Sequence, residues 1–204
     1  MSSVDRERIE AAVSEILAAI GDDPAREGLA QTPRRVADLF AELYGGVGVD
    51  PASAIGSTFT APDAQPVILR DITFRSVCEH HLMVFEGVAH VAYLPGERIA
   101  GLGGIVAVIE SASSRPQLQE RLGDEIAAAI ESALDSPGVL VVLDAKHGCV
   151  SARGPRQTRS TTVTLASRGV FTDPAARAEV IALIGTGSGT VPSAGLQDAP
   201  GEGR

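Results

Sequence analysis

The sequence predicts an α+β fold, with helices packed on one face of an antiparallel sheet. Two patterns lead to this prediction. In some segments apolar residues recur with the spacing of one helix face, which is typical of amphipathic helices. In others they alternate with polar residues, which is typical of half-buried strands. After an N-terminal helical part, strands, then helices, then strands follow one another, and this order favours helices segregated to one side of the sheet.

Two helices are expected at the N-terminus. The first covers residues 6–20, whose apolar stripe stops at Gly21. The second starts near Thr32 and Pro33, which are typical of an N-cap residue followed by proline at the first helical position. Both helices fall in residues 1–50, which we therefore expect to form a helical region in front of the remaining domain.

The remaining domain is expected to span residues 51–184 and to supply the sheet. It opens with a connector rich in Gly, Ala, Ser and Pro. The first two strands after this connector are interpreted as antiparallel neighbours. The expected elements are, in order, strands at 66–74 and 86–94, a helix from Ile105 that breaks near Arg115, a helix at 118–134, and strands at 139–144 and 160–167.

The composition narrows the function classes. No apolar run approaches the roughly 18 to 20 residues that a membrane-spanning helix needs, and the start lacks the basic-then-apolar pattern of a secretory signal. We therefore expect a cytoplasmic protein with no membrane partner. A formal net charge of -9 argues against non-specific nucleic-acid binding, which depends on Lys and Arg. Residues 185–204 are rich in Gly, Ser, Pro and Ala, which predicts a disordered tail.

The two cysteines of the chain each lie within three residues of a histidine. Cys78 is followed closely by His80 and His81, and Cys149 is preceded by His147. In a cytosolic protein such cysteines serve metal binding or catalysis more often than a disulfide. Zinc binds thiolate sulfur and neutral imidazole in a tetrahedral arrangement. The pattern therefore predicts a zinc site.

Spacing leaves several alternatives open. A structural site would be closed by four protein ligands, with His80 or His147 added, whereas a catalytic site keeps one position for water. The cysteines could instead be small buried hydrophobes or reactive thiols. Cys78 and His81 can converge only if their strand ends in a turn, because positions three apart on a straight strand face opposite sides. His147 and Cys149 share a face if the strand geometry continues.

Several longer motifs carry a family resemblance. They are CEHHLMVFEGVAHVAYLPGERIAGL from Cys78, RPQLQERL from Arg115, HGCVSARG from His147, TTVTLASRGVF from Thr161 and IGDDPAREGLAQTPRRVADLF from Ile20. In order and spacing, from about residue 9 to about residue 180, the chain resembles the GTP cyclohydrolase I family. The resemblance implies a tunnelling fold, in which subunits pool their sheets into a barrel and form active sites between them, usually as a homo-oligomer of ten subunits.

The resemblance also implies roles for single residues. His80 could still be a structural histidine, and Glu120 one charge on a helix face. The family's zinc ligands, catalytic histidines and substrate-binding residues all have counterparts here. These are Cys78, His81 and Cys149 for zinc, His80 and His147 for catalysis, Gln119 and Glu120 beside the guanine, with Glu120 reading the base, and Arg153 on a phosphate.

The reaction that the resemblance implies is hydrolysis of a guanine nucleotide. The guanine imidazole ring opens at C8, formate leaves, and GTP becomes 7,8-dihydroneopterin triphosphate. Zinc suits this chemistry because it lowers the pKa of bound water to about 7. Histidine suits it because an unperturbed pKa of about 6.5 lets it exchange protons near neutrality. A carboxylate such as Glu120 can accept both N–H groups of the guanine edge.

The chain departs from the family where the triphosphate is held. The family's serine, lysine and arginine fall on Gly103, Gly104 and Ala107, which removes charge-assisted contacts worth roughly 1.5 to 3 kcal/mol each. Val84 replaces a usual proline and Leu165 a usual serine. Three hypotheses follow: a hydrolase of GTP or a close variant, a hydrolase of a less phosphorylated purine-like or pterin-like substrate in a specialised biosynthetic pathway, or a non-catalytic assembly subunit with structural zinc.

Overall fold

A five-stranded sheet forms the centre of the computed structural model, which describes residues 4–61 and 65–185. The strands lie in the order β5, β2, β3, β6, β7, and all neighbours are antiparallel except β5, which runs parallel to β2. A small second sheet pairs β1 with β4. The strands are β1 Thr58–Thr60, β2 Val67–Cys78, β3 Val84–Leu94, β4 Arg98–Ala100, β5 Pro116–Gln117, β6 Gly138–His147 and β7 Thr162–Gly169.

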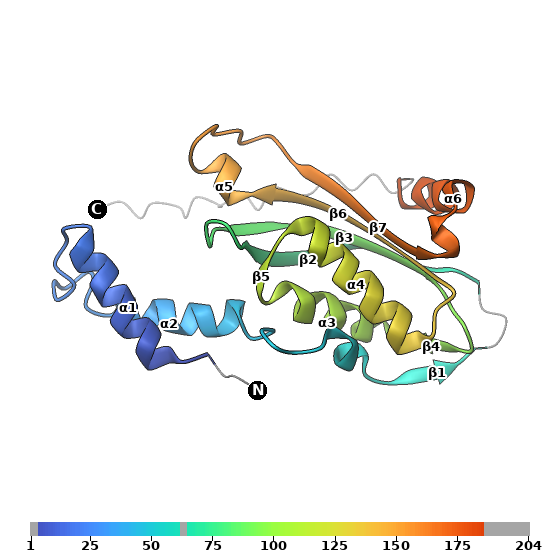
Figure 1. Cartoon of the computed structure of the whole chain (residues 1–204), viewed down its shortest axis with the longest axis horizontal. Coiled ribbons are helices and arrows are strands. Elements are labelled where there is room, and N and C mark those ends of the chain that lie inside the picture. The colour runs from blue at the N-terminus through green and yellow to red at the C-terminus, as the bar shows by residue number, and fades with distance from the viewer. Residues whose placement is uncertain (1–3, 62–64, 186–204) are drawn as a thin grey trace, which may run out of the picture.

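Two long helices cover one face of this sheet (Figure 1). α3 and α4 pack against each other and against β2, β6 and β7, which confirms the predicted α+β class. Ile105 and Ile126 of these helices are fully buried in one apolar core with Phe85, Val91 and Leu143 of the sheet. The helical segments are α1 Arg6–Ala19, α2 Thr32–Leu43, η1 Pro51–Ile55, α3 Leu102–Ser113, α4 Gln119–Leu134, α5 Gly148–Ser151, η2 Val170–Thr172 and α6 Pro174–Gly185.

Within the described residues, the opposite face of the sheet has a smaller core of its own at one end. Val180 and Ile184 of α6 and Phe171 of η2 pack there on Ala92 and Leu140. α6 is an addition to the predicted elements. Figure 1 shows α6 at one end of the sheet and α5 at the other.

The two N-terminal helices form as predicted and pack against each other. In Figure 1 they extend from the body of the protein at the same end as α5, and they do not lie over the sheet. Gln31, not Thr32, is the N-cap of α2, so Thr32 and Pro33 belong to its first turn. The expected connector contains η1 and β1, both of which are too short to show a periodic pattern.

No helix in residues 4–61 or 65–185 is long and apolar enough to cross a membrane. The predicted tail lies outside the described residues, apart from Gly185 at the end of α6. The division into a helical region at 1–50 and a catalytic domain at 51–184 stays a prediction.

Candidate active site

Cys78, His81 and Cys149 lie together at one end of the sheet. One ligand atom from each residue, two sulfurs and an imidazole nitrogen, lies within 4.8 Å of the others. In a tetrahedral zinc site with Zn–S bonds of about 2.3 Å, two sulfurs are roughly 3.8 Å apart. Only small side-chain shifts therefore separate this geometry from a ligating one. Two thiolates and an imidazole are donors that zinc prefers, so these residues fit that metal.

The turn after β2 brings Cys78 and His81 to the same side. The N–H of Cys78 donates to the carbonyl of Met83 over 2.9 Å, and the N–H of Leu82 donates to the carbonyl of Cys78 over 2.9 Å. Leu82 has a φ of 52°, in the left-handed region, where the chain reverses. The condition set by the sequence, a strand that ends in a turn, is therefore met.

Cys149 reaches the group from a different kind of element. β6 ends at His147 and the short helix α5 begins at Gly148, so the strand geometry does not continue to Cys149. The pairing of Phe85 with His147 puts the end of β6 beside the start of β3. A Cβ at Gly148 would lie 2.7 Å from the carbonyl oxygen of Val84, so this close approach requires glycine. The three residues thus come from a turn and from a short helix at the same end of the sheet.

His147 is held in one orientation by a buried amide. Its Nε2 lies 2.7 Å from Oε1 of Gln119. Nε2 of Gln119 donates over 3.1, 2.8 and 3.2 Å to three oxygen atoms. Because only the amide nitrogen can donate, these acceptors direct Oε1 toward the imidazole, and Nε2 of His147 is then the protonated nitrogen. The acceptors are the carbonyls of Leu143 and Thr162 and Oγ1 of Thr164.

The surroundings of His147 favour its neutral form. Burial lowers the pKa of His147, while the charge of Glu120 acts in the opposite direction. The imidazole stacks on Phe85, with ring centroids 4.7 Å apart and planes 4° apart. With Nε2 protonated, Nδ1 is the ring atom that can accept a proton.

Three other predicted residues lie near this group. His80 shares the turn with His81, and their ring centroids are 6.2 Å apart. Glu120 lies in the first turn of α4, near enough for its charge to act on His147. Arg153 follows α5, and its charge partly offsets the effect of burial, which raises the pKa of Cys149.

Gln119 differs from the other predicted substrate-binding residues in its exposure. It is 2% exposed. Both ends of its amide bond to the protein, which directs the side chain to His147. A contact of this side chain with a substrate would require these bonds to open.

Residues 9–185 match the sequence profile of the family described as GTP cyclohydrolase I. The chain belongs to the GTP cyclohydrolase I family. It is 60% identical over 190 residues to the GTP cyclohydrolase 1 of Leifsonia xyli subsp. xyli, which covers 92% of this chain and 100% of that one. It is 48% identical over 183 residues to the GTP cyclohydrolase 1 of Bacillus subtilis, covering 89% and 96%.

Membership of the GTP cyclohydrolase I family confirms that the chain is an enzyme and agrees with the tunnelling fold expected for the single subunit. A solved structure of the apo form of archaeosine synthase QueF-Like covers 52% of this chain and 96% of that chain at 18% identity. Its TM-score of 0.43 is too low to bear on fold or function.

The positions where this GTP cyclohydrolase I family member is expected to depart from the family lie away from Cys78, His81 and Cys149 within one chain. Gly103 is in the first turn of α3, whereas Ser113 at the other end of that helix accepts from Ser76 near the end of β2. Ten residues of α-helix correspond to about 15 Å. Val84 and Leu165, the two smaller departures, are 37% and 52% exposed.

The backbone of η1 approaches Gly104 so closely that there is no room for a side chain at this position. A Cβ at Gly104 would lie 2.0 Å from the carbonyl oxygen of Ile55, whereas a Cβ at Gly103 meets nothing within 4 Å. The space beside them is a pocket of about 380 Å³ without charged side chains. Its lining residues are Ala54, Ile55, Gly56, Ser57, Phe59, Gly101, Gly103, Gly104 and Ala107.

The structure adds two contacts that sequence reasoning missed. Glu79, inside the first motif, accepts a hydrogen bond from Arg121 of α4. Phe85, in the same motif, stacks on His147. Both residues fall inside the motif that begins at Cys78, but nothing in the sequence pattern identified their partners.

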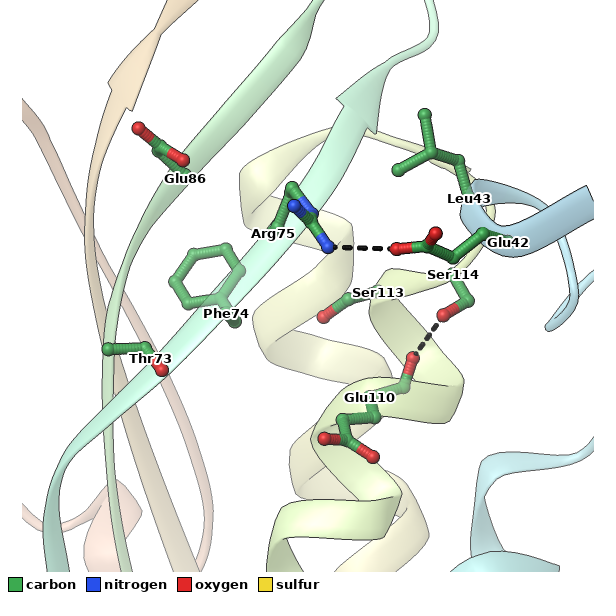
Figure 2. Close-up of a pocket in the computed structure, with 9 residues that line it drawn as sticks. All are labelled: Glu42, Leu43, Thr73, Phe74, Arg75, Glu86, Glu110, Ser113 and Ser114. Atoms are coloured by element: carbon green, nitrogen blue, oxygen red, sulfur yellow. Dashed lines mark hydrogen bonds and ion pairs between the residues drawn. The ribbon is translucent and has the colours of Figure 1, made fainter. Parts of the chain in front are cut away.

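A larger pocket of about 520 Å³ lies between α2, β2 and α3 (Figure 2). Arg75 points from β2 toward α2 and donates to Glu42 over 3.1 Å. Glu86 and Glu110 also line this pocket, and no histidine or cysteine does. The predicted chemistry therefore belongs to the group of Cys78, His81 and Cys149, which does not line this pocket.

Proposed function

We propose that this chain is a zinc-dependent GTP cyclohydrolase I, which opens the guanine imidazole ring at C8, releases formate and yields 7,8-dihydroneopterin triphosphate. The observation that carries the proposal is the grouping of the Cys78, His81 and Cys149 donor atoms within 4.8 Å, beside the oriented imidazole of His147. The family match over residues 9–185 and relatives named GTP cyclohydrolase 1 support it.

Cys78, His81 and Cys149 would hold the zinc ion. Three protein ligands leave one tetrahedral position open, as in catalytic zinc sites. The ion would supply Lewis acidity and lower the pKa of a bound water molecule to about 7. His81 is exposed, so the group can be reached from solvent.

His147 and His80 would move the protons of the hydrolysis. Because Gln119 engages Nε2 of His147, Nδ1 is the atom that takes up or delivers a proton. His80 neighbours the ligand His81 in the same turn. We assign to this pair the protonation of guanine N7 as the ring opens.

Glu120, Gln119 and Arg153 would bind the nucleotide. The Glu120 carboxylate can accept two N–H groups of the guanine edge, a pairing that adenine cannot offer. Gln119 would act on the guanine base indirectly, by orienting His147, since its amide is bonded to that residue. Arg153 would contact a phosphate, for which a guanidinium is well shaped.

A second candidate function keeps the same centre and changes the substrate. The pocket beside Gly103, Gly104 and Ala107 has no charged side chain. The carbonyl of Ile55 leaves no room for a side chain at Gly104. This arrangement favours a less phosphorylated purine-like or pterin-like substrate, whose turnover would survive removal of the phosphates.

The assembly is part of the proposal. By resemblance the enzyme is a homo-oligomer of ten subunits, and we expect it to work in the cytoplasm. Because the start of α3 and the metal ligands lie apart in one chain, both can serve one active site only if subunits share sites, as the resemblance implies.

A formate-release assay on zinc-loaded protein tests the proposal, with GTP, GMP, guanosine and guanine compared side by side. Formate from GTP alone supports the first function, and formate from the less phosphorylated compounds supports the second. His80→Ala and Cys149→Ser are the controls. If His80→Ala releases formate at the wild-type rate, or Cys149→Ser keeps full zinc and full activity, the assigned centre is wrong.

A further inference from the structure

We infer that Arg121 is a positioning residue, which fixes the turn bearing Cys78, His80 and His81 to α4 through its contact with Glu79. The inference rests on the proposed metal site. Arg121 acts through Glu79, a residue that lies between a metal ligand and a catalytic histidine in the chain. Its role would be to fix the position of the metal-binding side chains on this turn.

Glu79 is attached to the rest of the protein at two points. Its Oε2 accepts a hydrogen bond from Nη2 of Arg121. Its backbone N–H donates to the carbonyl of Gln117 in β5 over 3.1 Å. The side chain and the main chain of one turn residue therefore both connect to the segment that leads into α4.

Arg121 is itself held by a buried amide. Its Nε donates to Oε1 of Gln117 over 3.0 Å, and Gln117 is 1% exposed. The amide nitrogen of Gln117 donates to Glu125 over 2.7 Å and to the carbonyl of Ala112 over 3.1 Å, which fixes the orientation of the amide. The guanidinium thus uses one nitrogen for Gln117 and another for Glu79. A lysine has a single nitrogen and cannot reproduce this fork.

The first turn of α4 contacts both chain segments that supply the metal ligands. Gln119 bonds to His147, which ends the strand before Cys149. Arg121, two residues further on, bonds to Glu79, the residue after Cys78. α4 therefore adds side-chain contacts to both segments, beside the strand pairing that already joins them. Loss of the Arg121 contact would loosen only the turn after Cys78, which keeps its main-chain bond to Gln117, and the expected defect is in metal binding, with the fold retained.

Arg168 of β7 offers a matched control, because it makes an ion pair with the same helix. It donates to Glu131 of α4 over 3.1 Å, and the two side chains are 40% and 34% exposed. The corresponding values for Arg121 and Glu79 are 43% and 31%. Arg168→Gln therefore removes an ion pair of similar exposure from α4 without touching the turn after Cys78.

The experiment compares full-length wild type, Arg121→Gln, Glu79→Gln, the double variant that combines these two changes, Arg121→Lys and Arg168→Gln. The rate of zinc transfer to a chromogenic chelator reports how firmly the ion is held. The visible absorption of the Co²⁺-loaded proteins reports ligand geometry. Thermal unfolding of each variant shows whether the fold is kept.

We expect Arg121→Gln and Glu79→Gln to lose zinc about 10-fold faster than wild type and to change the Co²⁺ spectrum, and the double variant to be no worse than either. Arg121→Lys should recover only part of the loss. Arg168→Gln should match wild type. Wild-type zinc release and an unchanged spectrum in Arg121→Gln, or an equal change in Arg168→Gln, would overturn the inference alone. Failure of the wild type to bind zinc would overturn the metal site itself.

Discussion

Oε1 of Gln119 lies 2.7 Å from Nε2 of His147, while the amide nitrogen of the same residue donates to the carbonyls of Leu143 and Thr162. One buried side chain therefore joins the packing of α4 on the sheet to the position of a proton on a proposed catalytic histidine. A change at this residue should affect stability and turnover together.

Gln119→Leu tests this link. The substitution removes the donor to two carbonyls and one hydroxyl, which should lower the free energy of unfolding by about 2 kcal/mol or more. It also releases the His147 ring, and we expect kcat to fall about 100-fold, the lower end of what acid–base catalysis contributes. Urea unfolding and steady-state formate release measure the two effects. A variant that loses stability but keeps kcat would show that Gln119 serves packing alone.

The close approach of Ile55 to Gly104 predicts unequal effects of two neighbouring substitutions. Gly104→Ala would place a Cβ 2.0 Å from a backbone oxygen, so η1 must shift and we expect a loss of about 1 to 3 kcal/mol. Gly103→Ala meets nothing within 4 Å and replaces glycine in a helix, which should change stability by less than about 1 kcal/mol in the favourable direction. Thermal or urea unfolding of both variants decides, and equal losses would contradict the packing described here.

Removal of the metal should lower the melting temperature. A ligand present at about 1,000 times its Kd stabilises the folded state by about 4 kcal/mol, which for a chain of this size corresponds to roughly 8 to 16 °C. Differential scanning calorimetry with and without a strong chelator, followed by zinc addition, measures the shift. Cys149→Ser should have a lower melting temperature than the zinc-loaded wild type, and the chelator should not change it. A wild-type protein with the same melting temperature in both conditions would contradict the metal site.

Both tyrosines of the chain should resist ionisation in the folded protein. Burial raises the pKa of Tyr44 and of Tyr93, although the hydrogen bond from Ala100 partly opposes this at Tyr93. A raised folded-state pKa contributes stability below the unfolded value of about 10, and this contribution is lost as pH rises through the folded-state pKa. We expect the free energy of unfolding to fall above about pH 10 and tyrosinate absorbance to appear together with unfolding. A tyrosinate transition centred near 10 in protein that is still folded would contradict this.

The long helices and the central strand pairing could be predicted because their apolar patterns extend over several turns or pairs. The strand ends could not. The predicted end of β2 at Phe74 is four residues short, since Ser76 interrupts the apolar alternation. Ser76 is nevertheless buried, because its hydroxyl donates to the carbonyl of Ser113 over 2.7 Å. In the sequence alone, a polar residue inside a strand looks like the end of that strand, even when its hydrogen bond is made within the protein.

Short elements and tertiary contacts are the other features that could not be predicted from the sequence. α5 has four residues, too few to show a period, so the element that carries Cys149 could not be foreseen. The histidine close to each cysteine predicted a metal site but left the set of ligands open, and the family resemblance singled out Cys78, His81 and Cys149, which the structure groups together. The partners of Glu79 and His147 could not, since Arg121 and Gln119 lie 42 and 28 positions away.

Cys78 and Cys149 are 71 positions apart, the difference of their residue numbers. An ion bound to both would act as a cross-link that closes a long loop, and a covalent link over such a loop removes conformational entropy worth about 4 kcal/mol from the unfolded chain. The two thiols meet only after β2, β3 and β6 have paired, because each lies at the end of one of those strands or just beyond it. Metal loading should therefore be a late step in folding, and an ion that serves the proposed catalysis would also delay the chain's return to the unfolded state.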